Sequence, residues 1–465
     1  MKRYFFLLVI FSLFLGSRLL KLSENPPSVY WDEASVGYNA YAIGIDGKDE
    51  WGSFLPVHFR AFGEFKLPVY IYSVVPFVKI FGLNAFSVRF PSVLYSLGIV
   101  LLTYLLARKV TRNEAASIFS AFYVVVTPWL FIFSRTGYEA TAGLMLFLLG
   151  IYLYLKALEN PKWFLVATLS FIGSIYSYNS FRILSCFTLL PFTVYLIWKY
   201  RERLKKIILV LTFSLVLFIL SWVPIIRLYK YDMGGQRLLS VGLSGTTTQK
   251  IKGFATNYAY HYSPEFLFVN GDTNLRSQMP GFGQLYWVSL PFIIFGLLKI
   301  FKEKSFLHLS VFFLLLISPI PAALTKESPH ALRSIASLPF YAITVGIGLE
   351  YLTLKIRKYS SVVLVLTSLL FLFCFESYLI KYFTEYPVIS SKDWQFTYKQ
   401  VFEEYKSSPV KNQKVIVSDE YGQPYIFALF YLKFIPDDFR QTVKYNPPDK
   451  WGFSLVSSFA NFEFR

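Results

Sequence analysis

The sequence contains few charged residues, only 16% of its 465 residues, together with two cysteines and four histidines. A soluble globular protein or a disordered chain needs far more polar side chains, so the composition excludes both classes. The two cysteines, Cys186 and Cys374, lie inside apolar runs, which excludes a disulfide framework and a Cys/His metal cluster. The composition therefore predicts a membrane protein.

Hydrophobic residues make up 55% of the chain, and the mean hydropathy is +0.46. Eleven apolar stretches have the length of roughly 17 to 25 residues that crosses the hydrocarbon core of a bilayer. The predicted spans lie near residues 4–22, 86–107, 114–134, 141–158, 162–178, 182–199, 206–229, 284–301, 306–324, 333–354 and 360–380. Lys2 and Arg3 precede the first span and no small-residue cleavage site follows it, which favours a retained anchor over a removed signal peptide.

The distribution of basic residues explains the formal net charge of +18. If the N-terminus is cytoplasmic, the even-numbered connections lie inside, and basic residues gather there as the positive-inside rule describes. These residues are Arg108, Lys109, Arg112, Lys156, Lys162, Lys199, Arg201, Arg203, Lys205, Lys206, Lys299, Lys302, Lys304, Lys355, Arg357 and Lys358. Most of the positive charge is thus explained by the cytoplasmic connections. No nucleic-acid partner is expected.

The short apolar stretch from Leu67 to Leu83 does not fit this topology as a span. Pro68, Pro76 and Lys79 interrupt it, and a crossing here would place the basic residues 108–112 outside. We therefore predict an interfacial or re-entrant helix.

Three long segments remain for the outer face: residues 23–85, 230–283 and 381–465. The last contains a strand-like run, Val415–Ser418, and a helical apolar pattern from Pro424 to Phe434, which predict a small α/β appendage. The predicted fold is an α-helical polytopic membrane bundle of about 11 spans with interfacial helices in the first outer loop. Residues 1–380 are expected to form this transmembrane domain, and residues 381–465 the extracytoplasmic appendage.

Two adjacent acids, Asp32 and Glu33, begin a helical pattern that runs from Tyr30 to Tyr41 in the first outer loop. Successive helical residues point about 100° apart, so the two carboxylates cannot aim at one reacting atom. One can act as a base while the other orients a neighbour or a sugar hydroxyl. Alternatively, both acids simply complement the dipole of the helix.

Further motifs follow in the same loop: Trp51–Pro56, Gly63–Tyr70 and Phe81–Ser92. Together with Asp32-Glu33 they resemble the first external loop of GT-C type polyprenyl-phosphate-sugar glycosyltransferases, in the branch of the aminoarabinose transferases and protein O-mannosyltransferases (glycosyltransferase family 39). That family has an acidic pair, a Lys-Pro-Pro motif and an Arg-x-Pro-Ser motif in this order. Here the second motif reads Lys66-Leu67-Pro68, so leucine replaces the first proline. The resemblance covers roughly residues 1–355.

The resemblance implies a role for each matching residue. Asp32 would be the general base or would orient the acceptor, and Lys66 would hold the phosphate of the donor. A lone lysine at this place would otherwise be interpreted as an interfacial side chain that reaches into water. Asp32, Glu33 and Glu139 could surround a divalent cation, but the related branch generally works without a required metal, so no cofactor is expected.

Two outer turns between spans carry further candidates. In the turn 134–140, Glu139 matches an acid that the family has at this place, while Arg135 and Glu139 could instead form a local pair at i,i+4 spacing. The turn 176–182 contains Tyr178 and Arg182, which we consider as possible substrate contacts. Arg182 either touches phosphate or caps the end of a span.

Later in the chain, the aromatic segment 258–272 contains Tyr260 and His261, whose surroundings suit either sugar stacking or headgroup packing. Arg276 closes the polar part of this loop and is a weaker candidate. The segment 325–333 contains His330 and Arg333, which could share one face of a helix that begins near Pro329. By the resemblance this segment is the late basic motif that contacts donor phosphate.

The sequence thus predicts an inverting transferase in a bacterial-type cytoplasmic membrane, with its site on the extracytoplasmic face. Its partners would be a polyprenyl-phosphate-linked sugar donor and a lipid, glycan or protein acceptor. The alternatives are a transporter or flippase of lipid-linked saccharides and a non-catalytic envelope assembly protein. A transporter should place ionisable residues near mid-span, whereas those in this sequence gather at outer edges, which favours the enzyme.

Overall fold

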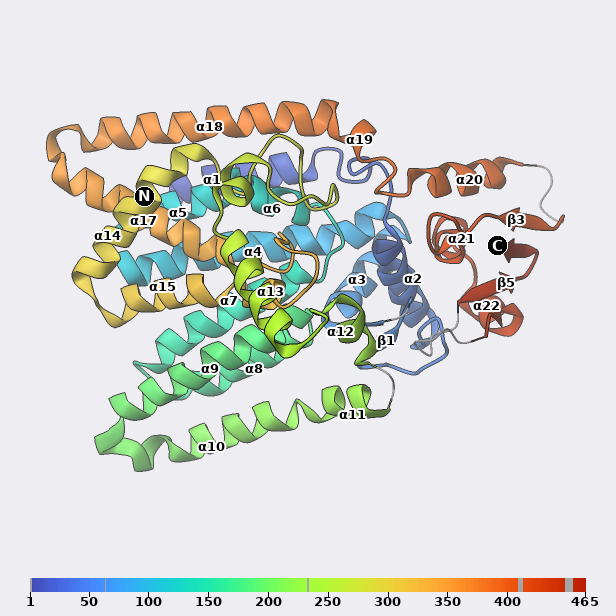
Figure 1. Ribbon diagram of the computed structural model, residues 1–465, viewed down its shortest axis with the longest axis horizontal. Coiled ribbons are helices and arrows are strands. Elements are labelled where there is room, and N and C mark those ends of the chain that lie inside the picture. The colour runs from blue at the N-terminus through green and yellow to red at the C-terminus, as the bar shows by residue number, and fades with distance from the viewer. Residues whose placement is uncertain (1, 63, 232–233, 409–412, 448–454) are drawn as a thin grey trace.

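Long apolar helices form the body of the molecule and run roughly along its long axis (Figure 1). The computed structural model describes residues 2–62, 64–231, 234–408, 413–447 and 455–465. The helices of the body are α1 (Lys2–Leu19), α4 (Ala85–Thr111), α5 (Glu114–Val126), α6 (Pro128–Phe133), α7 (Ala140–Ala157), α8 (Trp163–Ile175), α9 (Asn179–Lys199), α10 (Leu204–Leu220), α11 (Val223–Tyr231), α14 (Leu290–Glu303), α15 (Phe306–Ile317), α16 (Ile320–Ala323), α17 (Ser337–Lys355) and α18 (Ser360–Thr384).

Local sequence explains where several of these helices begin. The side chain of Asn84 accepts a hydrogen bond from Ser87 N at the start of α4, and that of Asn113 accepts one from Ala116 N at the start of α5. Such side chains satisfy amide groups that have no partner within the helix. Pro128 sits at the first position of α6, where a missing N–H costs nothing.

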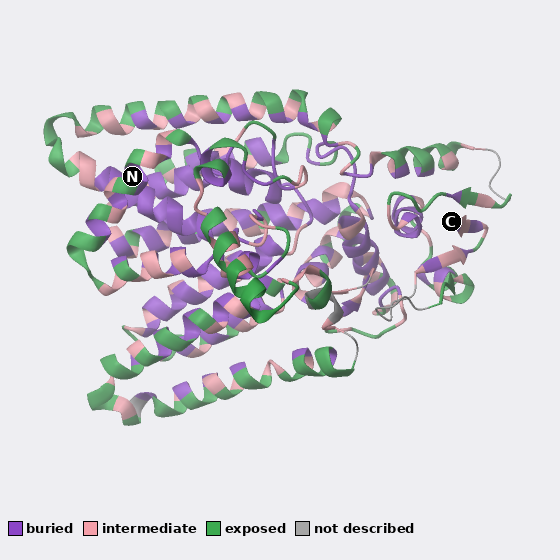
Figure 2. Ribbon diagram, viewed as in Figure 1, coloured by how far each residue is buried: buried purple, intermediate pink, exposed green. Residues whose placement is uncertain are grey.

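The predicted helical membrane fold is confirmed. Each of the eleven predicted spans coincides with one helix or with two consecutive ones, as for α5 with α6 and α10 with α11. Within the described residues, seven helical segments are long and apolar enough to cross a membrane. The segments that contain α10 and α18 are only 22% buried in their most apolar part, and Figure 2 shows both helices as largely exposed or half-buried. Their apolar side chains are surfaces that a bilayer would cover.

The first outer loop folds at one end of the body, on the right in Figure 1. It contains α2 (Trp31–Asp46), the strands β1 (Phe59–Arg60) and β2 (Phe65–Lys66), and α3 (Pro68–Phe81). The two strands pair antiparallel, with Phe59 opposite Lys66. The stretch that we expected to form an interfacial or re-entrant helix is indeed helical, as α3, while its depth in the membrane stays a prediction.

The second outer loop contains α12 (Gln236–Val241), α13 (Thr247–Tyr260) and a π-helical turn, Glu265–Val269. Helix α13 begins with a capping box between Thr246 and Gln249 and buries none of its residues. Figure 2 shows α13 as a mostly exposed helix in front of the body. In the part of the chain that the structure describes, short 3-10 turns occur at Arg201–Arg203, Trp287–Ser289 and Arg357–Tyr359.

The C-terminal region forms the predicted small α/β unit. Its elements are α19 (Tyr386–Ile389), α20 (Phe396–Ser407), β3 (Val415–Val417), α21 (Pro424–Leu432), α22 (Pro436–Thr442), β4 (Lys444–Tyr445), β5 (Val456–Phe459) and β6 (Phe462–Phe464). The sheet has the order β3-β6-β5-β4, in which β3 and β6 are parallel and the other pairs antiparallel.

This unit packs directly on the first outer loop. Helices α2, α3 and α21 and strands β3, β5 and β6 contribute to one apolar core, separate from the core of the membrane helices. A Cβ atom on Gly37 of α2 would lie 2.7 Å from the ring of Phe430 in α21 and 2.7 Å from Val88. The close contact between α2 and α21 therefore requires glycine at position 37.

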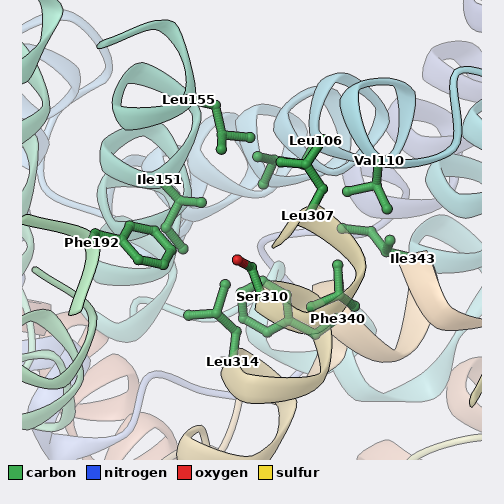
Figure 3. A pocket seen from close by; sticks show the side chains of 11 residues that line it. Leu106, Val110, Ile151, Leu155, Phe192, Leu307, Ser310, Leu314, Phe340 and Ile343 are labelled. Atoms are coloured by element: carbon green, nitrogen blue, oxygen red, sulfur yellow. The ribbon is translucent and has the colours of Figure 1, made fainter. Parts of the chain in front are cut away.

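A small apolar cavity lies deep among α4, α7, α9, α15 and α17 (Figure 3). Its volume of about 20 Å³ is room for about one water molecule, and Ser310 brings a hydroxyl group to an otherwise hydrocarbon lining. The cavity is a packing gap that could not hold a sugar.

We expect Gly37→Ala to weaken the contact between α2 and α21, because overpacking a core typically costs about 1–3 kcal/mol. The measurement is the thermal unfolding temperature together with the rate at which a protease releases the C-terminal unit. Gly16→Ala in α1 is the matched control, since a Cβ atom there meets nothing within 4 Å. Equal behaviour of the two variants would contradict the tight contact.

Candidate functional site

A buried ion pair fixes the start of α2. Arg89 of α4 donates from Nε to Glu33 Oε1 over 3.0 Å and from Nη2 to Glu33 Oε2 over 3.1 Å, and both side chains are fully buried. Glu33 also accepts hydrogen bonds from Gly137 N at 2.7 Å and from Tyr30 N at 3.2 Å. Both oxygen atoms of Glu33 are thus engaged within the protein, so Glu33 positions α2 and does not present its carboxylate to a substrate.

The same arginine holds the chain that leads into α2. Arg89 donates to the carbonyl oxygens of Leu22 and Pro26, each at 3.0 Å, and of Ser28 at 2.5 Å. Residues from the far end of the chain complete the support: Asn25 Nδ2 donates to Tyr382 O at 2.8 Å, and Trp31 N donates to Gln395 Oε1 at 3.1 Å. The segment just before Asp32 is therefore rigidly held from two sides.

Asp32 points away from this buried pair and meets Lys66 of β2. Lys66 Nζ lies 2.5 Å from Asp32 Oδ1 and 3.3 Å from Glu64 Oε1. The side chain of Lys66 is 4% exposed and that of Asp32 is 28% exposed, so the lysine is covered while the carboxylate still reaches solvent. Lys66 is thus not an interfacial side chain that reaches into water.

The carboxylates around Lys66 determine its charge. Burial by itself would lower the pKa of Lys66, but Asp32, Glu64 and Glu139 together raise that pKa above its ordinary value. The ammonium group is therefore a fixed cation at neutral pH.

Glu139, at the start of α7, is the third acid near Lys66, after Asp32 and Glu64. These four residues form the Asp32–Lys66 cluster. The Oε1 atom of Glu139 is buried and has no hydrogen-bond partner among the described residues. Burial raises the pKa of Glu139 to about 8, against the attraction of Lys66 and with the repulsion of Glu64 and Asp32. With a pKa near 8, this carboxyl group is mostly protonated at neutral pH and can donate a hydrogen bond, which a carboxylate cannot do.

The alternative local pair between Arg135 and Glu139 is not formed. Arg135 instead donates to carbonyl oxygens in the last turn of α1 and in the segment after it, namely those of Ser17, Arg18, Leu20, Lys21 and Asn25. Arg135 thus satisfies acceptors that a helix leaves open at its C-terminal end. The side chain predicted as a possible substrate contact is fully engaged in the structure, which corrects that prediction.

Arg276, a weaker candidate in the sequence, lies near Asp32, with Tyr30 and Tyr138 around it. The carbon of its guanidinium group is 3.8 Å from the ring centroid of Tyr30, and its buried Nε has no partner among the described residues. Burial by itself would lower the pKa of Arg276, but Tyr138, Tyr30 and Asp32 together raise it. The only sequence signal was an isolated arginine in an aromatic outer loop, which is too common to single it out.

The segment around His330 forms turns, and the helix expected to begin near Pro329 is absent, because α17 begins at Ser337. Its amide groups have partners within the protein: His330 N donates to His261 Nε2 at 3.2 Å, and Ala331 N donates to Asp272 Oδ2 at 2.7 Å. These amides are therefore not available to an anion.

Arg333 bonds within its own loop, where Nη1 donates to Thr325 Oγ1 at 2.9 Å and Nη2 lies 3.4 Å from Glu327 Oε2. The turn that contains His330 is nevertheless linked to Arg276 through Asp272. It holds Asp272, and Asp272 is four residues from Arg276, so their Cα atoms are at most about 14 Å apart. His261, His330 and Asp272 therefore position the loop that carries Arg276.

The remaining sequence candidates are Arg182, Tyr178 and Tyr260. Arg182 is 7% exposed and donates from Nη1 to the hydroxyl of Tyr229 at 3.2 Å. Tyr178 precedes α9 and packs edge-on against Phe181. Tyr260 is 53% exposed at the end of α13. Their predicted contacts with substrate stay predictions.

The three carboxylates considered as ligands of a divalent cation are not free together, because both oxygen atoms of Glu33 are bonded to Arg89. Among the described residues, no group of three or more His, Cys, Asp or Glu side chains has an arrangement that could hold a metal ion.

Known proteins resemble this chain both in sequence and in the arrangement of its helices. Residues 66–225 match the family model of the dolichyl-phosphate-mannose-protein mannosyltransferases. The structure resembles ArnT from Cupriavidus metallidurans in the apo state, with a TM-score of 0.59 and 10% identity over 92% of this chain and 84% of that chain. The same protein bound to undecaprenyl phosphate gives a TM-score of 0.57 with 13% identity and the same coverage.

The oligosaccharyltransferase of Archaeoglobus fulgidus is also similar, with a TM-score of 0.53 and 13% identity over 92% of this chain and 61% of that chain. No curated protein matches the chain by sequence. The resemblance to GT-C type glycosyltransferases is thereby confirmed, and the chain has the GT-C fold.

Glu33→Gln should lower the free energy of unfolding by about 3–5 kcal/mol, because it leaves the guanidinium of Arg89 buried without its counter-charge. Thermal unfolding of the purified protein in detergent measures the loss. The control is Lys109→Gln, which breaks the exposed pair between Lys109 and Glu159 at 2.7 Å. That change should cost no more than about 1 kcal/mol. Similar losses in both variants would argue against a supporting role for Glu33.

The raised pKa of Glu139 predicts a pH-dependent stability. In the unfolded chain this carboxyl ionises near its ordinary value of 4.5, and in the folded protein near 8, so folding favours the protonated form. The resulting stability is complete below the lower value and is lost as the pH rises through the higher one. From about pH 5 to about pH 9, the wild type should lose several degrees of unfolding temperature relative to Glu139→Gln.

The matched control for this pH series is Glu159→Gln, at an exposed acid on the opposite end of the body. Its profile should run parallel to that of the wild type over the same pH range. A profile of Glu139→Gln that also runs parallel would show that Glu139 ionises normally.

Proposed function

From the GT-C fold and the outer cluster of charges, we propose that the protein transfers a sugar from a polyprenyl-phosphate donor to an acceptor hydroxyl on the non-cytoplasmic face. The observation that carries this proposal is the contact between Asp32 and Lys66 at 2.5 Å. A carboxylate can take the proton of a nucleophile, and a buried cation beside it can stabilise the charge of a phosphate leaving group.

The reaction is a single displacement at the anomeric carbon. The acceptor oxygen forms a bond to this carbon while the bond from the carbon to the phosphate oxygen breaks. The hydroxyl proton passes to Asp32, and the polyprenyl phosphate leaves with the bonding electrons. Because the acceptor attacks from the side opposite the phosphate, the configuration at the anomeric carbon is inverted.

The ion pair itself offers a way to couple donor binding to base activation. Without donor, Asp32 neutralises Lys66, and one of its carboxylate oxygens, Oδ1, is bonded to Lys66 Nζ. A donor phosphate that binds Lys66 takes over this neutralisation and releases the carboxylate for the acceptor. Arg276, with its unpartnered Nε, is the second cation for the phosphate, because charge-assisted hydrogen bonds to oxyanions are among the strongest available.

Glu139 is suited to a different task. In its protonated form it can donate a hydrogen bond to a hydroxyl oxygen of the sugar, which helps to orient the anomeric carbon. His330 and Arg333 support the donor site indirectly, through the loops that they hold. This assignment replaces the direct phosphate contact predicted for these two residues.

The similar proteins support a lipid-phosphate donor. ArnT from Cupriavidus metallidurans has been solved bound to undecaprenyl phosphate, and the Archaeoglobus fulgidus oligosaccharyltransferase in complex with a dolichol-phosphate. A flippase would instead place its binding residues near mid-span on opposing helices. Asp32, Lys66 and Glu139 all lie in an outer loop or at the very start of a helix.

Asp32→Asn should abolish transfer and leave donor binding largely intact, whereas Lys66→Ala should weaken donor binding by about 1.5–3 kcal/mol, the value of a hydrogen bond to a charged group. Binding is measured with undecaprenyl phosphate as the probe and the purified full-length protein. Lys79→Ala is the matched control, because Lys79 lies in the same outer loop, on α3, and is exposed.

Transfer is measured by mass spectrometry of lipid extracts from cells that lack the gene and express either the wild type or a variant. A lipid-phosphate sugar should accumulate in cells without the protein and in cells with Asp32→Asn, and should disappear with the wild type. Wild-type turnover by Asp32→Asn would remove Asp32 from the mechanism. Unchanged affinity of Lys66→Ala for the probe would refute the phosphate site.

A further inference from the structure

A second cavity opens at the end of the body opposite the Asp32–Lys66 cluster. It has a volume of about 440 Å³, within the range of about 300–1,000 Å³ that is typical of small-molecule sites. Its walls are the first turns of α5 and α18, the last turns of α17, and the connection between α17 and α18. This is the left end of the body in Figure 1.

Several polar groups in the wall already have partners. Glu350 Oε2 accepts a hydrogen bond from Lys299 Nζ of α14 at 2.7 Å. Asn113 caps the first turn of α5, and Thr353 Oγ1 donates to the carbonyl oxygen of Leu349 at 2.9 Å. The negative charge of Glu350 is therefore neutralised inside the protein and does not repel an anion in the cavity.

The other polar groups in the wall are free. Among the described residues, Arg357, which is exposed, makes no hydrogen bond, ion pair or ring contact, and the hydroxyl groups of half-buried Ser360 and exposed Ser361 have no hydrogen-bond partner. These serines form the start of α18, whose first amide groups lack a side-chain cap. Arg357, Ser360 and Ser361 all line this cavity, and a guanidinium, hydroxyls and a helix N-terminus are the kinds of donor that bind an oxyanion.

The two lysines next to Arg357 differ from it. Lys355 lies 4.7 Å above the ring of Tyr351, and Lys358 lies 5.5 Å above the ring of Tyr359. Neither lines the cavity. Arg357 is therefore distinguished from the general basic belt by its position and by its lack of a partner.

The surroundings favour a lipid over a soluble anion. Leu349, Leu354 and Leu364 form the apolar part of the wall, beside the two serines. Val362 and Val365 of α18 are 54% and 55% exposed on the surface that meets the bilayer. The positive-inside prediction places this end at the cytoplasmic leaflet, which is rich in anionic lipids that basic pockets between helices bind. A soluble anion would make no favourable contact with the apolar wall, whereas the acyl chains of a lipid would.

We propose that this cavity binds the phosphate headgroup of an anionic phospholipid from the cytoplasmic leaflet, through Arg357, Ser360 and Ser361. The lipid would fill the gap between α17 and α18 and join the weakly packed α18 to the rest of the body. This proposal requires a membrane-spanning chain but no transferase activity, so it can fail or succeed independently of the proposed function.

The test uses the purified full-length protein in a neutral detergent and measures its unfolding temperature against increasing short-chain phosphatidylglycerol. We expect saturable stabilisation by this lipid, none by the matching phosphatidylcholine, and none by inorganic phosphate at the same concentration. Arg357→Gln should raise the concentration needed for half the effect about tenfold. Ser361→Trp, which fills the polar side of the cavity without a change in charge, should also abolish the effect.

Lys358→Gln is the matched control: it removes a neighbouring charge of the same belt and should keep the wild-type response. An equal loss in Lys358→Gln and Arg357→Gln would show that the belt as a whole attracts the lipid, which overturns the proposed site. Stabilisation by inorganic phosphate alone would mean a site for a soluble anion, and an absence of any shift would mean no site.

Discussion

The bidentate pair between Glu33 and Arg89 is the interaction on which the outer half of the molecule depends. Both side chains are fully buried, and Arg89 also binds carbonyl groups of the segment that leads into α2. Adjacent helical residues diverge by about 100°, so a fixed Glu33 also fixes the direction of Asp32. One residue of the acidic pair thus supports the structure, and the other is left for chemistry.

Charge balance makes the cluster around Lys66 compatible with the proposed phosphate site, although acids surround the lysine. Lys66 and Arg276 are cations, Asp32 and Glu64 are counter-charges, and the pKa of Glu139 near 8 removes most of a third negative charge at neutral pH. A phosphate therefore meets a site without a net excess of negative charge. The burial of Lys66 strengthens this effect, because screening by water is weak there.

The sequence predicted the elements with a strong local signal and missed those that depend on tertiary contacts. Apolar length alone located the eleven helical segments, and the resemblance around residues 30–92 singled out Asp32 and Lys66, which the structure brings into contact. The role of Arg135 was not predictable, because its acceptors lie at the end of α1, more than 100 residues away. Arg276 has no local motif. The turn at His330 replaces a helix because Asp272 and His261 accept hydrogen bonds from its amides.

The support that Asn25 and Trp31 receive from Tyr382 and Gln395 joins two stretches separated by more than 350 residues. During synthesis, the segment before Asp32 emerges among the first parts of the protein, while its partners emerge among the last. The outer cluster therefore cannot reach its final geometry until nearly the whole polypeptide has been inserted. An incomplete product that stops before Tyr382 would lack both of these contacts, so the segment that leads into α2 would be held from one side only.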